Sequence, residues 1–295
     1  MPTHLVALVS GMGWHVQDLQ RAAAKLGVRL DALPFPKLVG RVEARGPNVS
    51  AGLMALDAVD GVLVRMMPPG GLERVVFRMD SLHRLESAGV PVLNPASAIE
   101  TAVDKYLALA RLHEAGLPVP PTWVGESAAD AEAAFIELGG DVVVKPIFGA
   151  EGRGLVRVSD PELARRAFHT LERLQAVLYL QKFIQNPGHD LRVFVLGECL
   201  VGAIRRHVPA GDWRANVAIG GRAEAFEPDL ETKRLALRAA RAVGARMAGV
   251  DLLPTREGDL LVVEVNAVPG WKALSAATGV DVAAAVLDDL RVWTQ

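Results

Sequence analysis

Two carboxylates and one amide near the C-terminus have the spacing of a metal site. The segment VDLLPTREGDLLVVEVN, residues 250–266, predicts two apolar strands joined by a turn at Glu257-Gly258. A hairpin centred on that turn pairs Asp251 with Glu264, and Asn266 lies two residues further along the same face. A register slip of one residue would separate these side chains, so the prediction depends on the turn.

The chemistry of these three residues favours a hard divalent cation. Two adjacent carboxylates do not both ionise unless positive charge lies between them. Oxygen ligands without histidine or cysteine suit Mg²⁺ or Mn²⁺, whose coordination is often completed by substrate phosphates. We therefore expect Asp251, Glu264 and Asn266 to be metal ligands. The alternative is a solvated hairpin edge, which is less favoured because both carboxylates interrupt apolar strands.

A glycine-rich stretch, KPIFGAEGRG at residues 145–154, could cover phosphates. Its spacing matches neither the phosphate loop nor the dinucleotide fingerprint, and both of those motifs lead from a strand into a helix. Here the flanking segments DVVVK and GLVRV both predict strands. The pattern thus predicts a hairpin whose tip is a flap with Lys145 at its mouth, or else a glycine-rich turn that binds nothing.

Arginines between the flap and the carboxylates supply the charge that a magnesium-nucleotide complex requires. The candidates are Arg192, Arg205, Arg206 and Arg214. Adjacent residues of a strand point to opposite faces, so we expect only one of Arg205 and Arg206 to face the site. Solvation at the surface is the alternative for each arginine taken alone.

The elements that must position these residues indicate an α/β protein with three parts. Alternating strands and a helix at 14–26 predict an open parallel sheet within residues 1–95. GMGW, at the first turn from strand to helix, is interpreted as a tight turn because Val16 replaces the third glycine of a dinucleotide motif. Residues 96–184 hold the flap, and residues 185–295 hold the carboxylates. An Ala/Arg-rich helix is expected from about Asp229 to Ala248.

Composition limits the function classes. The 295 residues are 51% hydrophobic and 22% charged, with a formal charge of -2, which argues against a nucleic-acid surface. No stretch approaches the roughly 18 apolar residues of a membrane span. The single cysteine, Cys199, lies in the apolar run FVLGECLVGAI and is expected to be buried. Together these features predict a cytoplasmic protein without nucleic-acid or membrane partners.

The order of the motifs resembles the ATP-grasp superfamily, and within it the RimK-like glutamate ligases. The resemblance covers nearly the whole chain through DKYLALARL, KPIFGAEGRG, LQKFI, HDLRVFV, AIRRH, GDWRANVAIGG, and VDLL paired with EVNAVPG. It implies an ATP-grasp fold of two α+β lobes that follows an N-terminal preparatory domain. It also implies that the protein uses ATP together with two Mg²⁺ or Mn²⁺ ions. The protein is further expected to be a homo-oligomer, either a dimer or a tetramer.

The resemblance assigns roles to individual residues. Asp251, Glu264 and Asn266 match the metal ligands. Positions near the transferred phosphate and the bound carboxylate are matched by Arg192, Arg206, Arg214 and Asn216. The remaining matches are nucleotide contacts, which comprise the phosphate lid, the adenine-binding hinge and the ribose-binding acid. They are Lys105, Lys145, Gly149, Gly152, Arg153, Gly154, Gln181, Lys182, Phe183, Ile184 and Asp190.

The activity implied by the resemblance is an ADP-forming carboxylate-amine ligase that works through an acylphosphate. The branch that adds L-glutamate to tetrahydromethanopterin-type coenzymes is the most similar, and peptide-like carboxylates are other acceptors. The alternatives are a ligase acting on a protein C-terminus or an amino-group carrier protein, and an ATP-binding regulator without turnover. Lys182 stands where relatives usually have an acid, and Ala218 and Ile219 stand where basic residues are common. These departures leave the donor and the acceptor open.

Overall fold

The N-terminal part of the chain forms an open parallel sheet. The computed structural model describes residues 3–43, 48–149, 154–214 and 222–293. Strands β1 (His4–Val9), β2 (Arg29–Pro34), β6 (Gly61–Val64) and β7 (Val92–Leu93) pair in the order β2-β1-β6-β7, and every pairing is parallel. The prediction of an open parallel sheet is therefore confirmed. Helix α1 (Trp14–Leu26) has the predicted bounds.

Helix α2 (Leu72–Ser87) and a small antiparallel sheet, both in the N-terminal part, were not predicted. That sheet contains β3 (Leu38–Gly40), β4 (Val49–Ala51) and β5 (Met54–Ala55), with short 3₁₀ turns η1 (Phe35–Lys37) and η2 (Leu56–Ala58) beside it. Helices α3 (Ala96–Val103) and α4 (Lys105–Glu114) follow, and the side chain of Asp104 caps α4 by accepting from the N–H groups of Tyr106 and Leu107.

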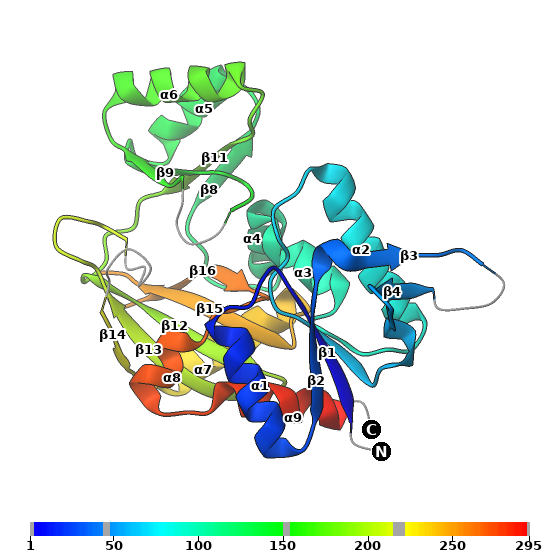
Figure 1. Cartoon of the computed structure of the whole chain (residues 1–295). Helices are drawn as coiled ribbons and strands as arrows, with labels where there is room; N and C mark the ends of the chain where they lie inside the picture. The colour runs from blue at the N-terminus through cyan, green and yellow to red at the C-terminus, as the bar shows by residue number, and fades with distance from the viewer. Residues whose placement is uncertain (1–2, 44–47, 150–153, 215–221, 294–295) are drawn as a thin grey trace.

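The central lobe is a second, antiparallel sheet with its own core. Its strands pair in the order β10-β9-β11-β8 and comprise β8 (Thr122–Gly125), β9 (Val142–Lys145), β10 (Val156–Val158) and β11 (Leu178–Lys182). Helices α5 (Ala128–Glu137) and α6 (Pro161–Arg173) cover one face, where Phe135 and Phe168 pack with apolar side chains of the sheet. Figure 1 shows this lobe standing above the C-terminal sheet, with the N-terminal sheet to one side.

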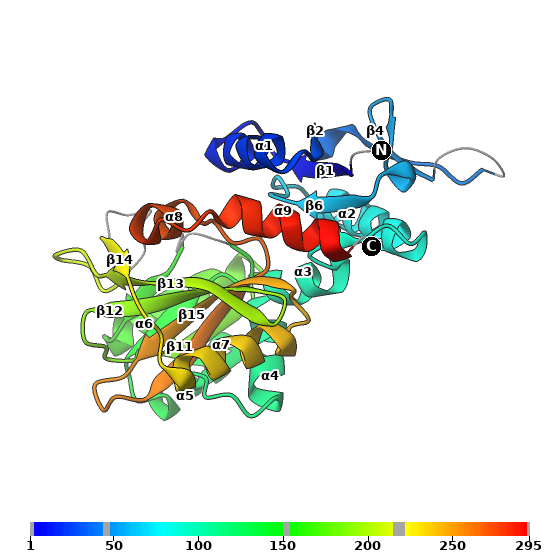
Figure 2. The same ribbon diagram turned by 90° about the horizontal axis from the view of Figure 1, so that it is seen from below.

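The C-terminal sheet has five antiparallel strands in the order β14-β13-β12-β15-β16. These strands are β12 (His189–Leu196), β13 (Cys199–His207), β14 (Ala223–Ala225), β15 (Met247–Pro254) and β16 (Leu260–Asn266). Helix α7 (Leu230–Ala242) packs on the sheet, while α8 (Lys272–Thr278) and α9 (Val282–Trp293) complete the chain. Figure 2 shows α9 between the N-terminal helix α1 and the C-terminal sheet, and α9 contacts both α1 and β6.

Two sequence predictions about this part are wrong. The helix expected to reach Ala248 ends at Ala242, because Gly244 turns the chain with φ 73° and residues 247–248 already belong to β15. Cys199 is exposed rather than buried, because it begins β13 directly after a turn at Gly197. Apolar neighbours in the sequence do not bury a residue at the exposed start of a strand.

Hydrophobic cores join the first and last parts of the chain. One core combines Val6 and Leu8 of the N-terminal sheet with Val250 and Val265 of the C-terminal sheet, and Ala98 of α3 packs into the same cluster. This packing holds the carboxyl ends of β1 and β6 near the C-terminal sheet. No helix in the described part of the chain is long and apolar enough to cross a bilayer.

Candidate active site

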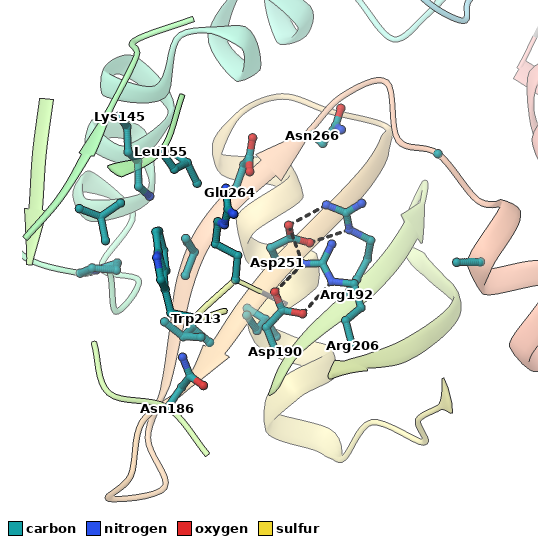
Figure 3. A pocket seen from close by; sticks show the side chains of 18 of the residues that line it. Lys145, Leu155, Asn186, Asp190, Arg192, Arg206, Trp213, Asp251, Glu264 and Asn266 are labelled. Atoms are coloured by element: carbon teal, nitrogen blue, oxygen red, sulfur yellow. Dashed lines mark hydrogen bonds and ion pairs between the residues drawn. The ribbon is translucent and has the colours of Figure 1, made fainter. Parts of the chain in front are cut away.

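A cavity of about 850 Å³ lies where the three parts of the chain meet (Figure 3). The central sheet, the C-terminal sheet, the start of α1 and the loop after β6 all contribute to its walls. Its lining includes, from these parts in turn, Lys145, Gln181, Asp251, Glu264, His15 and Arg65. The base of the flap, the predicted metal ligands and the N-terminal residues therefore line the same cavity.

The register of the β15–β16 hairpin is the predicted one at the candidate metal site. Asp251 pairs with Glu264, both line the cavity, and Asn266 lines it as well. Nearer the turn the ladder is offset by one residue, because Leu252 pairs with Val262 and leaves Val263 as a β-bulge. The bulge brings Glu264 into line with Asp251, so the pairing is confirmed although the turn is not centred as expected.

Asp251 belongs to a network of two acids and two arginines that is set by strand register. Arg192 lies opposite Asp251 on β12 and donates to both carboxylate oxygens at 2.7 and 2.6 Å. Arg206 lies opposite Asp190, donates to both of its oxygens at 2.7 and 2.6 Å, and reaches Asp251 at 3.0 Å. The four formal charges cancel. Figure 3 shows all four side chains on the same side of the sheet.

Burial and the arginine charges have opposite effects on the pKa values of the two acids in this network. Burial raises the pKa of Asp190 to about 6, against the opposing effect of Arg206. For Asp251 burial also acts to raise the pKa, but the charges of Arg192 and Arg206 outweigh it and hold the pKa below its usual value. Arg205 points away and pairs with Glu224 at 3.3 Å. The prediction that only one of Arg205 and Arg206 faces the site is confirmed.

Glu264 has a different environment from Asp251. It makes no hydrogen bond or ion pair with any other residue that the structure describes, although Lys105 and Lys145 are close enough to interact with its charge. The Oδ1 atom of Asn266 accepts the N–H of Val268 at 2.8 Å. Within the described ranges no group of three or more His, Cys, Asp or Glu residues is placed to hold a metal ion.

The flap is a hairpin, as predicted. Strands β9 and β10 pair in antiparallel fashion, from Val142 with Val158 to Val144 with Val156. At its base, Gly149 and Gly154 have φ angles of 146° and 76°, which disfavour any residue with a Cβ. Lys105 ties the flap to α4 by donating to the carbonyl of Gly149 at 2.6 Å. Gly152 and Arg153 of the flap, and Asn216, lie outside the described residues.

Lys145 lies inside the cavity and its ammonium group is held in place. It donates to Oε1 of Gln181 at 2.6 Å, and Gln181 in turn donates to the hydroxyl of Thr122 at 2.9 Å. Burial lowers the pKa of Lys145 to about 8; the charge of Glu264 opposes this and that of Lys105 adds to it. Lys145 is thus a cation that an anionic ligand would stabilise.

The predicted hinge, residues 181–184, runs along the cavity wall. The N–H groups of Lys182 and Phe183 donate to the carbonyls of Pro121 and Asp141, both at 2.9 Å. The side chain of Lys182 is exposed, whereas the Phe183 ring contacts Trp213 with centroids 5.9 Å apart. Arg214 also lines the cavity, and its guanidinium pairs with Asp212 at 2.8 Å.

Some cavity residues were not singled out in the sequence. His15, Arg65 and Lys272 line the part of the cavity formed by the start of α1, the loop after β6 and the start of α8. The only local signal was the GMGW turn, which lies immediately before His15. Nothing near Arg65 in the sequence indicated that it would be buried.

Comparison with known proteins identifies the family. The model of the RimK-like ATP-grasp domain matches residues 102–290. A tetrahydromethanopterin:alpha-L-glutamate ligase of Methanosarcina acetivorans is 37% identical over 269 residues, which cover 82% of each chain. A probable alpha-L-glutamate ligase of Parasynechococcus marenigrum is 33% identical over 277 residues, which cover 92% of this chain and 58% of that protein.

The fold agrees with this relationship. The structure of the ATP-grasp ligase PsnB complexed with minimal precursor, Mg and ADP aligns with a TM-score of 0.79 at 23% identity, covering 99% of this chain and 97% of that one. The α/β class and the ATP-grasp fold are thereby confirmed, as is the resemblance on which they were predicted. With a domain model that matches more than half of its length, the chain belongs to the RimK-like ATP-grasp family of ADP-forming ligases.

Proposed function

We propose that this enzyme uses ATP and Mg²⁺ to join L-glutamate to the carboxylate of a coenzyme of the tetrahydromethanopterin type or of a peptide-like acceptor. The observation that carries the proposal is the single cavity that joins Lys145, Glu264, Asp251 and Asn266. Support for the coenzyme comes from the relative of 37% identity, which is named for tetrahydromethanopterin and alpha-L-glutamate. The departures at Lys182 and at residues 218–219 do not remove any of these cavity groups.

The residues present fit a magnesium site. Glu264 offers a carboxylate with no protein partner in the described part of the chain, and Asp251 and Asn266 add oxygens from the same face. All three ligands are hard oxygens, as Mg²⁺ requires. We propose that they hold two ions, which would neutralise charge between the triphosphate and the attacking carboxylate. The four-residue network around Asp251 fixes one of these ligands before any ion binds.

For the nucleotide, we propose that Lys105, Lys145 and the glycines of the flap contact phosphates. Gln181 to Ile184 would hold adenine. Because the N–H groups of Lys182 and Phe183 are already bonded, the hinge would recognise adenine through carbonyls and the N–H of Ile184. Both oxygens of Asp190 accept from Arg206, so a contact with ribose would use the remaining lone pairs of Asp190.

The proposed reaction has two steps. The acceptor carboxylate attacks the γ-phosphorus of ATP, which forms an acylphosphate and releases ADP. The amine of glutamate then attacks the acyl carbon, forms the amide bond, releases phosphate and loses a proton. We propose that Arg192, Arg206, Arg214 and Asn216 support the charges that develop, and that the flap excludes water from the acylphosphate.

The organisation of the chain remains part of the proposal. We propose a preparatory domain at 1–95, a central ATP-grasp lobe at 96–184 and a C-terminal lobe at 185–295. We also propose that the enzyme is a dimer or tetramer, which light scattering of the purified protein would measure.

The test is a coupled assay of ADP release with ATP, Mg²⁺, L-glutamate and a panel of acids. The panel contains a tetrahydromethanopterin-type coenzyme, glutamyl peptides and peptides with acidic C-termini. We expect ADP only when an acid and glutamate are both present, and a product that mass spectrometry finds heavier by one glutamate residue. Nucleotide binding without turnover of any pair would instead indicate an ATP-binding regulator.

A further inference from the structure

Arg65 lies at a position of the N-terminal sheet where open α/β folds commonly bind ligands. It directly follows β6, and its N–H donates to the carbonyl of Leu8 on β1 at 2.9 Å. In the order β2-β1-β6-β7, β2 lies on one side of β1, whereas β6 and β7 lie on the other. The direction in which strands are added therefore reverses between β1 and β6. Ligands of open α/β sheets bind outside the carboxyl ends of the strands at such a reversal.

The guanidinium of Arg65 is almost completely buried. Its exposed fraction is 3%, and its Nε and Nη1 atoms have no hydrogen-bond partner among the residues that the structure describes. No acidic side chain of the described residues pairs with it, and its one ring contact is Trp271, 4.7 Å from the guanidinium carbon. Burial lowers the pKa of Arg65 to about 10, so the side chain still carries its charge at neutral pH.

Other buried arginines of this protein do have partners. Arg206 is balanced by Asp190 and Asp251, and Arg78 donates to the carbonyl of Pro68 at 2.6 Å. Buried donors in folded proteins are almost always bonded, and a buried charge without a partner is costly. A cation of this kind that lines a substrate cavity therefore calls for an anion that arrives with a ligand.

The surroundings of Arg65 also favour an anion. The Nε2 atom of His15 accepts the N–H of Trp271 at 3.1 Å. Burial and the charges of Arg65 and Lys272 lower the pKa of His15 to about 4, although Asp18 opposes them, so this imidazole is neutral at pH 7. Asp18 is itself occupied, because it accepts from the indole of Trp271 at 2.9 Å and pairs with Arg21 at 2.8 Å.

We propose that Arg65 binds a carboxylate of a ligase substrate at the N-terminal end of the cavity, with Lys272 as a second cation. This inference rests on the proposed function for the identity of the substrates. The planar guanidinium matches a carboxylate in shape and in donors, and its stacking on Trp271 fixes its orientation. The carboxylate belongs to the acceptor or to the incoming glutamate, which share this chemistry.

The substitution Arg65→Met separates this role from a structural one. It removes a buried charge that has no acidic partner in the described ranges, so we expect a melting temperature equal to or above that of the wild type. We expect the KM of one carboxylate substrate to rise about 10- to 100-fold, as for the loss of hydrogen bonds to a charged group, while the KM for ATP stays within about twofold. Arg65→Lys restores part of the loss. The substrate whose KM rises is the source of the carboxylate.

Arg78→Met is the matched control. Arg78 is 5% exposed and bonded to the protein, so this variant should melt at a lower temperature with unchanged KM values. Arg65→Met would overturn the inference if all KM values stayed at those of the wild type, or if it melted as low as the control.

A binding measurement keeps the inference testable if no substrate pair turns over. Calorimetry with glutarate and with L-glutamate as probes, in the presence of ADP and Mg²⁺, should show binding to the wild type that Arg65→Met loses. Such a result without turnover would reject the proposed function and retain the role of Arg65. Equal binding by both proteins, or no binding by the wild type, would reject that role.

Discussion

Neutralising either of the two candidate metal carboxylates should impair catalysis to the same extent, but the two substitutions should differ strongly in their cost to stability. Asp251→Asn removes one charge from a buried network of two acids and two arginines and leaves a cation uncompensated. Breaking a buried pair in this way costs about 3–5 kcal/mol. Glu264→Gln removes a carboxylate that has no hydrogen bond or ion pair within the described residues, so it should cost less than about 1 kcal/mol.

These free energies translate into melting temperatures. Unfolding entropy near 60 °C is about 2.1 cal/mol/K per residue, or roughly 0.6 kcal/mol/K for a chain of 295 residues that unfolds cooperatively. Asp251→Asn should therefore lower the melting temperature by about 5–8 °C, and Glu264→Gln by less than about 2 °C. Both variants should lose at least about 100-fold in turnover, because each removes a ligand of the proposed metal site.

Differential scanning calorimetry and the ADP-release assay measure the two quantities. Glu224→Gln is the control, because Glu224 is an acid of the same sheet that pairs with Arg205 on the side away from the site. It should retain wild-type turnover. The reasoning fails if Glu264→Gln turns over at the wild-type rate, or if it is destabilised as much as Asp251→Asn.

Three further predictions concern titration and exposure. In metal-free buffer, affinity for ADP should fall as pH rises through about 8, where Lys145 loses its proton, whereas Lys145→Arg should keep its affinity in a fluorescence titration up to about pH 10. The folded pKa of His15, about 4, is below its unfolded value of 6.5, so its contribution to stability is present above pH 6.5 and is lost as pH falls towards 4. The melting temperature of the wild type should thus fall more steeply across that window than that of His15→Gln; parallel curves would contradict this. Cys199 should react with one equivalent of maleimide in the native state without loss of turnover, and a requirement for denaturant would show that it is buried.

Local pattern was sufficient wherever the partners are close in sequence. The Asp251–Glu264 pairing followed from the apolar alternation of two strands joined by one short turn. The choice between Arg205 and Arg206 followed from strand parity. Even so, parity did not predict the bulge at Val263, which compensates for a turn that differs from the expected one.

The local sequence pattern did not predict features that depend on backbone conformation or on solvent exposure in the folded chain. An Ala/Arg-rich composition favours helix up to Ala248, but composition does not report that Gly244 adopts a left-handed conformation and that β15 begins at Met247. Cys199 is surrounded by apolar residues in the sequence, and its exposure depends on its place at the start of β13. The ion pairs of Arg192 with Asp251 and of Arg214 with Asp212 likewise depend on the folded chain, because several acids are possible partners in the sequence.

Arg65 shows the limit of reasoning from the sequence most clearly. In DGVLVRMM the arginine follows a short buried strand, and a charge at the end of a strand is ordinarily solvated. In the folded chain its guanidinium lies over the ring of Trp271, which comes from the other end of the sequence, just before α8. Arg65, which has no acidic partner among the described residues, therefore lines the same cavity as the candidate metal ligands. Because no acid among the described residues pairs with Arg65, a carboxylate of the substrate would explain why a cation is buried in this cavity.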